Sequence, residues 1–126
     1  MPSLANATPV TFVSVIDRER ALAFYQKTLG LGLISSDEHG AFLSMSGALL
    51  RITPMPDFKA SPHPVVGWNV NDIRASAQAL VSAGVAFAIY DGFDQDELGI
   101  WTSPDGATKL ARFSDPDGNV LTLSQA

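Results

Sequence analysis

The sequence predicts an α+β fold of two tandem βαβββ modules, forming a curved, mainly antiparallel sheet with helices on its outer face and a concave ligand cavity. Two segments share one layout: "VTFVSVIDRERALAFYQKTLG" from Val10 and "VVGWNVNDIRASAQALVSAG" from Val65. In each, an alternating apolar strand leads to an Asp and then to a helical pattern that stops at a Gly. The two Asp residues lie 55 positions apart (72 minus 17), which indicates a duplicated module of roughly sixty residues.

Both helices carry start and stop signals. Asp17 and Asp72 are placed to accept hydrogen bonds from the unpaired amides of the first turn. Gly30 and Gly84 suit the left-handed position that ends a helix. At 3.6-residue spacing, each helix has an apolar face expected to pack on a sheet: Ala21, Phe24, Tyr25 and Leu29 in the first, and Ile73, Ala77, Leu80 and Val81 in the second.

Short strands are expected after each helix. In the first half they cover residues 31–35, 41–46 and 48–53. The second half offers one candidate more, at residues 86–90, 100–103, 108–114 and 120–124, and the "TSPDGA" hairpin is the one that the pattern supports least.

The chain length fits a single domain covering residues 1–126. The stretch "PMPDFKASPHP" holds four prolines and reads as a linker. The predicted boundaries are therefore module one at about 8–54, the linker at about 55–63 and module two at about 64–126.

Composition narrows the function. A net charge of −5 without a Lys/Arg run argues against a nucleic-acid partner, because phosphate binding needs a clustered basic face. The apolar runs are too short to span a membrane, and the first ten residues lack the features of a secretory signal, so we expect a cytoplasmic protein. With no Cys, disulfides, thiolate nucleophiles and thiolate metal sites are all excluded.

Strand alternation predicts which side chains face the open side of the sheet. Val13, Val15, Leu50, Ile52, Leu121 and Leu123 should point to the helices. The opposite parity places Phe12, Arg51, Arg112 and Thr122 on the open face. Two arginines in one hollow would present planar donors matched to a carboxylate or phosphate. In the alternative, each arginine is a rim residue paired with one of the 13 acids.

Two motifs carry a family resemblance: "VIDRERALAFYQKTLGLGL" and the closing turn and strand "DPDGNVLTL". Through them the chain resembles the vicinal oxygen chelate superfamily, which includes glyoxalase I, extradiol dioxygenases, fosfomycin-resistance enzymes and bleomycin-resistance proteins. The resemblance covers nearly the whole chain. It implies the fold given above, a small-molecule site in the hollow and, by analogy, a homodimer.

The resemblance also implies where a divalent metal would bind in metal-dependent members, which use a His or Gln on the first strand of each module and a Glu on the last. The matching positions here are Val10, Val65, Arg51 and Thr122. Valine has no lone pair, arginine stays protonated and a lone hydroxyl is a weak ligand. We therefore expect no metal and no other cofactor.

Two other residue types are candidates for the site. His63 in "SPHPV" could act as a general base or substrate contact, and we regard it as the weak catalytic candidate; His39 sits in a turn, and neither is expected to bind metal. Among the aromatic residues outside the helices, Trp101 is expected at the edge of a lid over the hollow, following the acidic "YDGFDQDE". Phe42, Phe58, Tyr90 and Phe93 could fill the core or contact a ligand.

These observations favour a metal-free binding protein of the glyoxalase/bleomycin-resistance type, with a planar, anionic small-molecule ligand and a role in drug sequestration or resistance. The ligand-binding residues predicted are Phe12, Arg51, Trp101, Arg112 and Thr122. The alternative is a glyoxalase-like lyase or isomerase, or a dioxygenase-type enzyme, with a non-standard site. A purely structural or regulatory module is the third option, and no residue singles it out.

Overall fold

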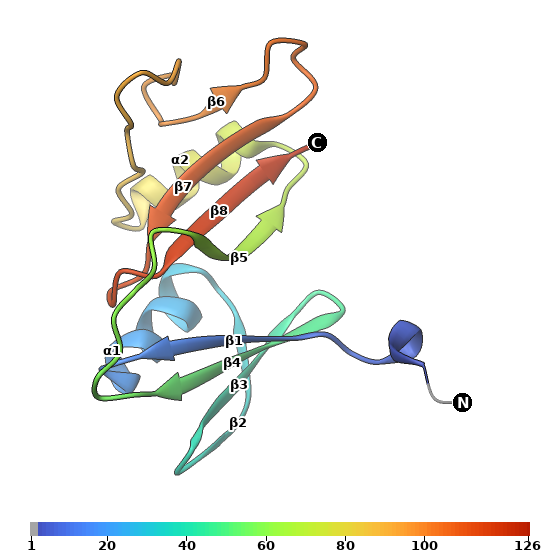
Figure 1. The fold of residues 1–126 in the computed structure, drawn as a ribbon, viewed down its shortest axis with the longest axis vertical. Helices are drawn as coiled ribbons and strands as arrows, with labels where there is room; N and C mark the ends of the chain where they lie inside the picture. The colour runs from blue at the N-terminus through green and yellow to red at the C-terminus, as the bar shows by residue number, and fades with distance from the viewer. Residues whose placement is uncertain (1–2) are drawn as a thin grey trace. The chain divides into compact units, whose positions relative to one another are not determined.

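A computed structural model describes residues 3–126. The chain divides into two compact units, one that ends at Phe58 and one that runs from Lys59 to Ala126 (Figure 1). The division falls inside the predicted proline-rich linker. The expectation that both modules form one domain stays a prediction.

Module one has the predicted βαβββ order (Figure 1). A short 3-10 turn, Leu4–Asn6, precedes it. Its sheet has the strand order β1-β4-β3-β2, with β1 parallel to β4 and the other neighbours antiparallel. The elements are β1 (Val10–Val15), α1 (Arg18–Ala23), the π-helical turn η2 (Phe24–Thr28), β2 (Gly32–Asp37), β3 (Gly40–Met45) and β4 (Ala48–Pro54).

Module two repeats the order (Figure 1). Its sheet has the order β5-β8-β7-β6, again with the first pair parallel and the others antiparallel. The elements are β5 (Pro64–Asn69), α2 (Ile73–Ser82), β6 (Trp101–Thr102), β7 (Lys109–Ser114) and β8 (Val120–Gln125). The tandem βαβββ fold predicted from the sequence is thus confirmed.

Both helix starts follow the prediction. Asp17 accepts a hydrogen bond from the Arg20 amide, and Asp72 accepts one from the Ala75 amide, each at 3.1 Å. The Gln125 side chain at the end of β8 accepts a further hydrogen bond from the Ile73 amide at 2.8 Å. The first turn of α2 is therefore capped from within the helix and from the sheet on which it packs.

The helix ends also match. Gly30 and Gly84 have φ values of +78° and +100°, in the left-handed region that glycine adopts without steric cost. The first helix differs from the prediction in its second half, because it widens into the π-helical turn, where the Leu29 amide donates to the Phe24 carbonyl.

Strand parity is as predicted in both modules. Val13, Val15, Leu50 and Ile52 are buried beneath α1, and Leu121 and Leu123 are buried on the side of α2. On the helices, Ala21, Tyr25, Ile73 and Ala77 are buried as expected. Val81 is 46% exposed, so its predicted place on the packed face is wrong. At 3.6 residues per turn it lies about 80° around the axis from Ile73.

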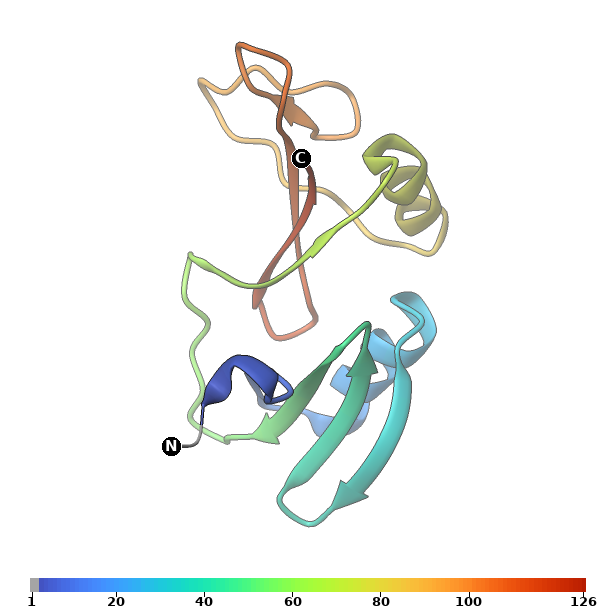
Figure 2. The same cartoon turned by 90° about the vertical axis from the view of Figure 1, so that its right-hand side faces the viewer.

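One predicted strand is absent. Residues 86–90 form no strand, whereas the "TSPDGA" hairpin does connect β6 to β7, closed by the Ser103 amide donating to the Thr108 carbonyl at 2.8 Å. The segment between α2 and β6 reaches β7 through one backbone hydrogen bond, from the Ala88 amide to the Arg112 carbonyl at 2.8 Å. The edge position of β2 in module one is thus held in module two by the two-residue β6, preceded by an irregular segment. In Figure 2, β7 and β8 are seen edge on, α2 lies to one side, and the gold loop before β6 runs from α2 across to the other side.

Within residues 3–126, no helix is long and apolar enough to cross a membrane.

Candidate functional site

A pocket of about 250 Å³ lies in module two, between the irregular segment and β7. Sheet pairing puts Trp101 directly opposite Leu110, so that both side chains lie on the same face of the sheet. The pocket is therefore walled by β6 and β7 on one side and by the loop that precedes β6 on the other. Its lining residues are Tyr90, Phe93, Gln95, Gly99, Trp101, Leu110, Ala111 and Arg112.

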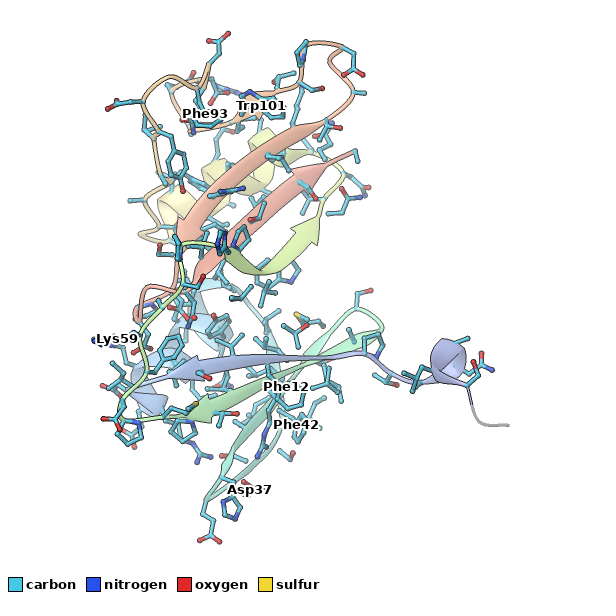
Figure 3. All side chains as sticks on the ribbon, viewed as in Figure 1. Phe12, Asp37, Phe42, Lys59, Phe93 and Trp101 are labelled. Atoms are coloured by element: carbon cyan, nitrogen blue, oxygen red, sulfur yellow. The ribbon has the colours of Figure 1, made fainter. Side chains whose placement is uncertain are left out.

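Three of these residues are aromatic. The Tyr90 and Phe93 rings meet edge to face, with centroids 6.1 Å apart, and Phe93 is 63% exposed. Figure 3 shows Phe93 and Trp101 close together in module two. Exposed rings that border a pocket offer flat apolar surface to a planar ligand.

The loop that carries Tyr90 and Phe93 is organised around the Gln95 side chain. Its amide nitrogen donates to the carbonyls of Ala88 and Gly99, at 3.0 and 2.8 Å. Its amide oxygen accepts from the Tyr90 amide at 2.8 Å. These bonds satisfy backbone groups that a regular strand would have paired with a neighbour, which is how the chain avoids a strand here without leaving those groups unsatisfied.

The outer edge of the same loop is tied to α2. Arg74 hydrogen-bonds to Glu97 and to Asp96, the second contact at 3.2 Å. The bond from Arg74 holds the pKa of the Glu97 carboxyl below its usual value and raises that of Arg74. Asp96 also accepts from the Leu98 and Ile100 amides, both at 2.9 Å, so the loop is bonded at its outer edge as well as at Gln95.

Arg112 supplies the positive charge of the pocket. In the part of the chain that the structure describes, no acid or hydrogen-bond acceptor pairs with its guanidinium. Across the sheet it faces Thr122, which in turn faces Gly67. The Thr122 hydroxyl is buried and has no hydrogen-bond partner among the described residues. A half-buried guanidinium and a buried hydroxyl, neither with a protein partner among the described residues, therefore occupy neighbouring positions on β7 and β8.

In module one, the arginine at the corresponding place in the sheet contacts neighbouring side chains of the protein. Sheet pairing aligns Phe12, Arg51 and Phe42 across β1, β4 and β3. The Arg51 guanidinium lies 4.6 Å from the centre of the Phe42 ring and 3.7 Å from the Asp37 carboxylate. Its side chain is 14% exposed. The charge of Arg51 is thus already met by an aromatic face and an acid.

Asp37 stabilises the β2–β3 turn next to this arginine. Its carboxylate accepts from the amides of His39 at 2.8 Å and Gly40 at 3.1 Å. The pKa of Asp37 is held below its usual value, mainly by the hydrogen bond from His39 and further by the charge of Arg51, although desolvation acts in the opposite direction. Figure 3 shows Asp37 at the end of the hairpin, with Phe12 and Phe42 in the same module.

The structure brings together two of the predicted ligand-binding residues, Trp101 and Arg112, which line one pocket. Thr122 lies beside Arg112 on the next strand. Phe12 and Arg51 are neighbours in module one and are not among the residues that line this pocket, so their contact with a ligand stays a prediction. Sequence reasoning missed Gln95, because no periodicity or motif distinguishes a glutamine inside an acidic loop.

The histidines lie elsewhere. His63 is exposed just before β5, and its backbone amide donates to the Ser61 hydroxyl at 3.1 Å. It does not line the pocket, and a catalytic role for it stays a prediction. His39 is exposed in the β2–β3 turn, with its ring nitrogen 3.4 Å from the Glu38 carboxylate.

The residues present do not fit the divalent metal that the resemblance implies for other members. Arg51 is stacked on Phe42, and Thr122 offers a single hydroxyl. Val10 and Val65 provide no donor atom. Among residues 3–126, no three His, Cys, Asp or Glu side chains gather closely enough to hold a metal ion.

Comparison with known families identifies the lineage. The profile of the Glyoxalase/Bleomycin resistance protein/Dioxygenase superfamily matches residues 8–123. The chain belongs to this superfamily. The resemblance inferred from the two sequence motifs is confirmed.

Several solved structures share the fold of this chain. The antibiotic-binding protein TnmS3 from Streptomyces sp. CB03234 is 26% identical, with a TM-score of 0.70 and 98% of each chain covered. The glyoxalase family protein from Enterococcus faecalis is 16% identical, with a TM-score of 0.76 over 97% of this chain and 99% of that one. Lactoylglutathione lyase from Agrobacterium tumefaciens is 15% identical, with a TM-score of 0.74 over 98% and 96%.

At their level of identity, the last two structures establish the fold and no activity. A search of curated proteins found no match to this chain.

Proposed function

We propose that this superfamily member is a metal-free binding protein that holds a planar, anionic small molecule in the module-two pocket. The observation that carries the proposal is the meeting of three aromatic side chains and an unpaired arginine around one cavity. Aromatic walls bind flat apolar surface, and a guanidinium adds a directional contact to a carboxylate.

The volume of the pocket supports a small ligand. At about 250 Å³ it is below the range of roughly 300–1,000 Å³ that is common for drug-sized ligands. Two of its lining residues, Tyr90 and Phe93, are exposed. A ligand with one ring or two fused rings is the best match. A larger substituent would extend past the Tyr90 and Phe93 rings into solvent.

The state of the two arginines supports an anionic ligand bound at Arg112. Arg51 already has a ring and a carboxylate as neighbours. Within the described part of the chain Arg112 has neither, and the Thr122 hydroxyl on the adjacent strand also lacks a partner there. A ligand carboxylate in the pocket would accept from the Arg112 guanidinium, since Arg112 is a lining residue and Thr122 is not.

The metal positions and one relative support binding without metal chemistry. The side chains at the four positions lack the donors that a divalent ion needs. TnmS3 is named as an antibiotic-binding protein, and it matches this chain over its whole length. We extend that property to sequestration of a small aromatic compound by this chain, in a homodimer as the resemblance implies; light scattering of the purified protein checks the oligomeric state.

The test is a ligand screen by thermal shift, followed by calorimetry, with aromatic carboxylates and their neutral carboxamides as matched pairs. The carboxylates should stabilise the protein and bind about tenfold or more tightly than the amides, as expected for one charge-assisted contact. Metal analysis of the purified protein accompanies the screen. Equal binding of acids and amides would contradict the anionic ligand, and a stoichiometric, tightly held divalent metal would contradict metal-free binding.

A further inference from the structure

The hydrogen bonds of Gln95 limit what it can offer to a ligand. A glutamine side chain has two N–H donors and an oxygen with two lone pairs. Both donors are used by the protein, one on the Ala88 carbonyl and one on the Gly99 carbonyl. The oxygen accepts from the Tyr90 amide and has one lone pair left. Toward a ligand, this pocket residue is therefore an acceptor only.

The orientation of the amide is set by its surroundings. If oxygen and nitrogen were exchanged, the oxygen would face two carbonyl oxygens, and the nitrogen would point its hydrogens at the Tyr90 N–H. All three contacts would become repulsive, so one orientation alone satisfies the network. The acceptor character of Gln95 is a consequence of the backbone around it.

Arg112 has the opposite character, since a guanidinium donates and never accepts. We infer that Gln95 is a specificity-determining residue, and that the ligand carries a hydroxyl or amino donor for Gln95 in addition to the anionic group for Arg112. The ligand class is then a hydroxy- or amino-substituted aromatic acid. This inference rests on the proposed function. Tyr90 does not impose such a choice, because its hydroxyl can donate or accept.

The experiment compares three kinds of probe on the wild-type chain by calorimetry: naphthoic acid, its positional hydroxy isomers and the matched methoxy compounds. A methoxy group keeps the oxygen attached to the ring and removes its O–H donor. At least one hydroxy isomer should bind about fivefold or more tightly than both its methoxy partner and the parent acid, in line with one added hydrogen bond.

Variants locate the effect. Gln95→Met removes the amide at similar length and should abolish the preference for hydroxyl over methoxy. Gln78→Met, on the exposed side of α2, is the matched control and should retain the preference. If the Gln95→Met variant no longer binds naphthoic acid, it cannot report a preference. The affinities of the hydroxy, methoxy and parent acids for the wild-type chain then test the inference.

The outcomes separate the two proposals. If the parent acid binds but no hydroxy isomer exceeds it, the specificity assigned to Gln95 is wrong and the proposed function stands. A hydroxyl preference that persists in Gln95→Met also overturns the assignment. If no carboxylate binds the wild-type chain, the proposed function fails and this inference fails with it.

Discussion

The two modules have the same order of elements and differ in the segment after the helix. In module one, β2 is a full strand that pairs with β3, and Arg18 fastens their turn through Ser36 and through the Gly40 carbonyl at 2.9 Å. In module two, an irregular loop precedes a two-residue strand, and Arg74 fastens that loop through Asp96 and Glu97. Module one therefore has complete strand pairing after its helix, whereas module two has a pocket at the corresponding place.

The two modules show how a duplicated fold comes to have a pocket in one copy. Where the ladder is complete, Arg51 is held between Phe42 and Asp37. Where the ladder is interrupted, the Gln95 side chain bonds to the backbone groups that lack a strand partner, and the Arg112 guanidinium has no partner among residues 3–126. Loss of regular pairing thus leaves a pocket while the backbone polar groups stay hydrogen-bonded.

The largest expected effect concerns the close packing of module one at Gly40. A side chain at Gly40 would place its Cβ 2.3 Å from the Ile52 carbonyl oxygen and 3.0 Å from the Arg51 guanidinium carbon. Gly40→Ala should destabilise the protein by about 3 kcal/mol, since a backbone atom has to move. Denaturant unfolding measures this. Gly32→Ala, where a Cβ meets nothing within 4 Å, is the control and should change stability far less.

Removing an aromatic wall tests the pocket of module two. Trp101→Ala should weaken binding of an aromatic carboxylate by about thirtyfold or more, the loss typical of a central aromatic anchor. Titration calorimetry gives the affinity. The folded state of the variant is checked by its thermal transition, and unchanged affinity in a folded variant would place the ligand elsewhere.

Replacing each arginine by alanine tests whether the two differ in ligand binding as they differ in their surroundings. Arg112→Ala should lower the affinity for a carboxylate probe by about tenfold and leave the matched carboxamide nearly unaffected, because one charge-assisted contact is lost. Arg51→Ala should have the smaller effect on binding, since its charge is already paired. Equal losses in both variants would mean that both arginines contact the ligand, as the two-arginine site predicted from the sequence requires.

The smallest effect concerns acid stability. Because the pKa of Asp37 is lower in the folded protein than its ordinary 3.8, its stabilising contribution is complete above that value and is lost as the pH falls through the lower, folded value. Asp37→Asn should therefore lower the melting temperature near neutral pH, and the difference from wild type should shrink on acidification to about pH 2.

Local patterns predicted much of the fold because the interactions involved are local. The "DPDGN" turn is an example: Asp115 accepts from the amides of Asp117 and Asn119, each at 2.9 Å, and from the Asn119 side chain at 2.8 Å. Turn and alternation together predicted that Leu121 is buried and that Thr122 is on the other face, opposite Arg112. The helix caps and stops were predictable for the same reason.

The prediction of a strand at residues 86–90 failed because apolar composition there does not reveal the competing partner. The Gln95 side chain takes up the Ala88 carbonyl and the Tyr90 amide. A glutamine carries no signal of this role, and the segment holds apolar residues as a strand would. Position and parity placed Trp101 and Arg112 among the predicted ligand-binding residues, whereas their meeting with Tyr90 and Phe93 around one pocket depends on the path of this loop.

By itself, the sequence determined the superfamily, the duplicated βαβββ order, the helix limits and the face on which each strand residue lies, because these depend on spacing and short-range hydrogen bonds. The tertiary structure decided that Arg51 contacts an acid and a ring, and that Arg112 has no partner among the described residues. Arg51 meets Asp37 and Phe42 only because the strand order β1-β4-β3-β2 aligns them. Arg112 lines a pocket only because Gln95 holds an irregular loop beside β7. Both outcomes depend on contacts between residues distant in sequence or in irregular backbone, which no periodic pattern records.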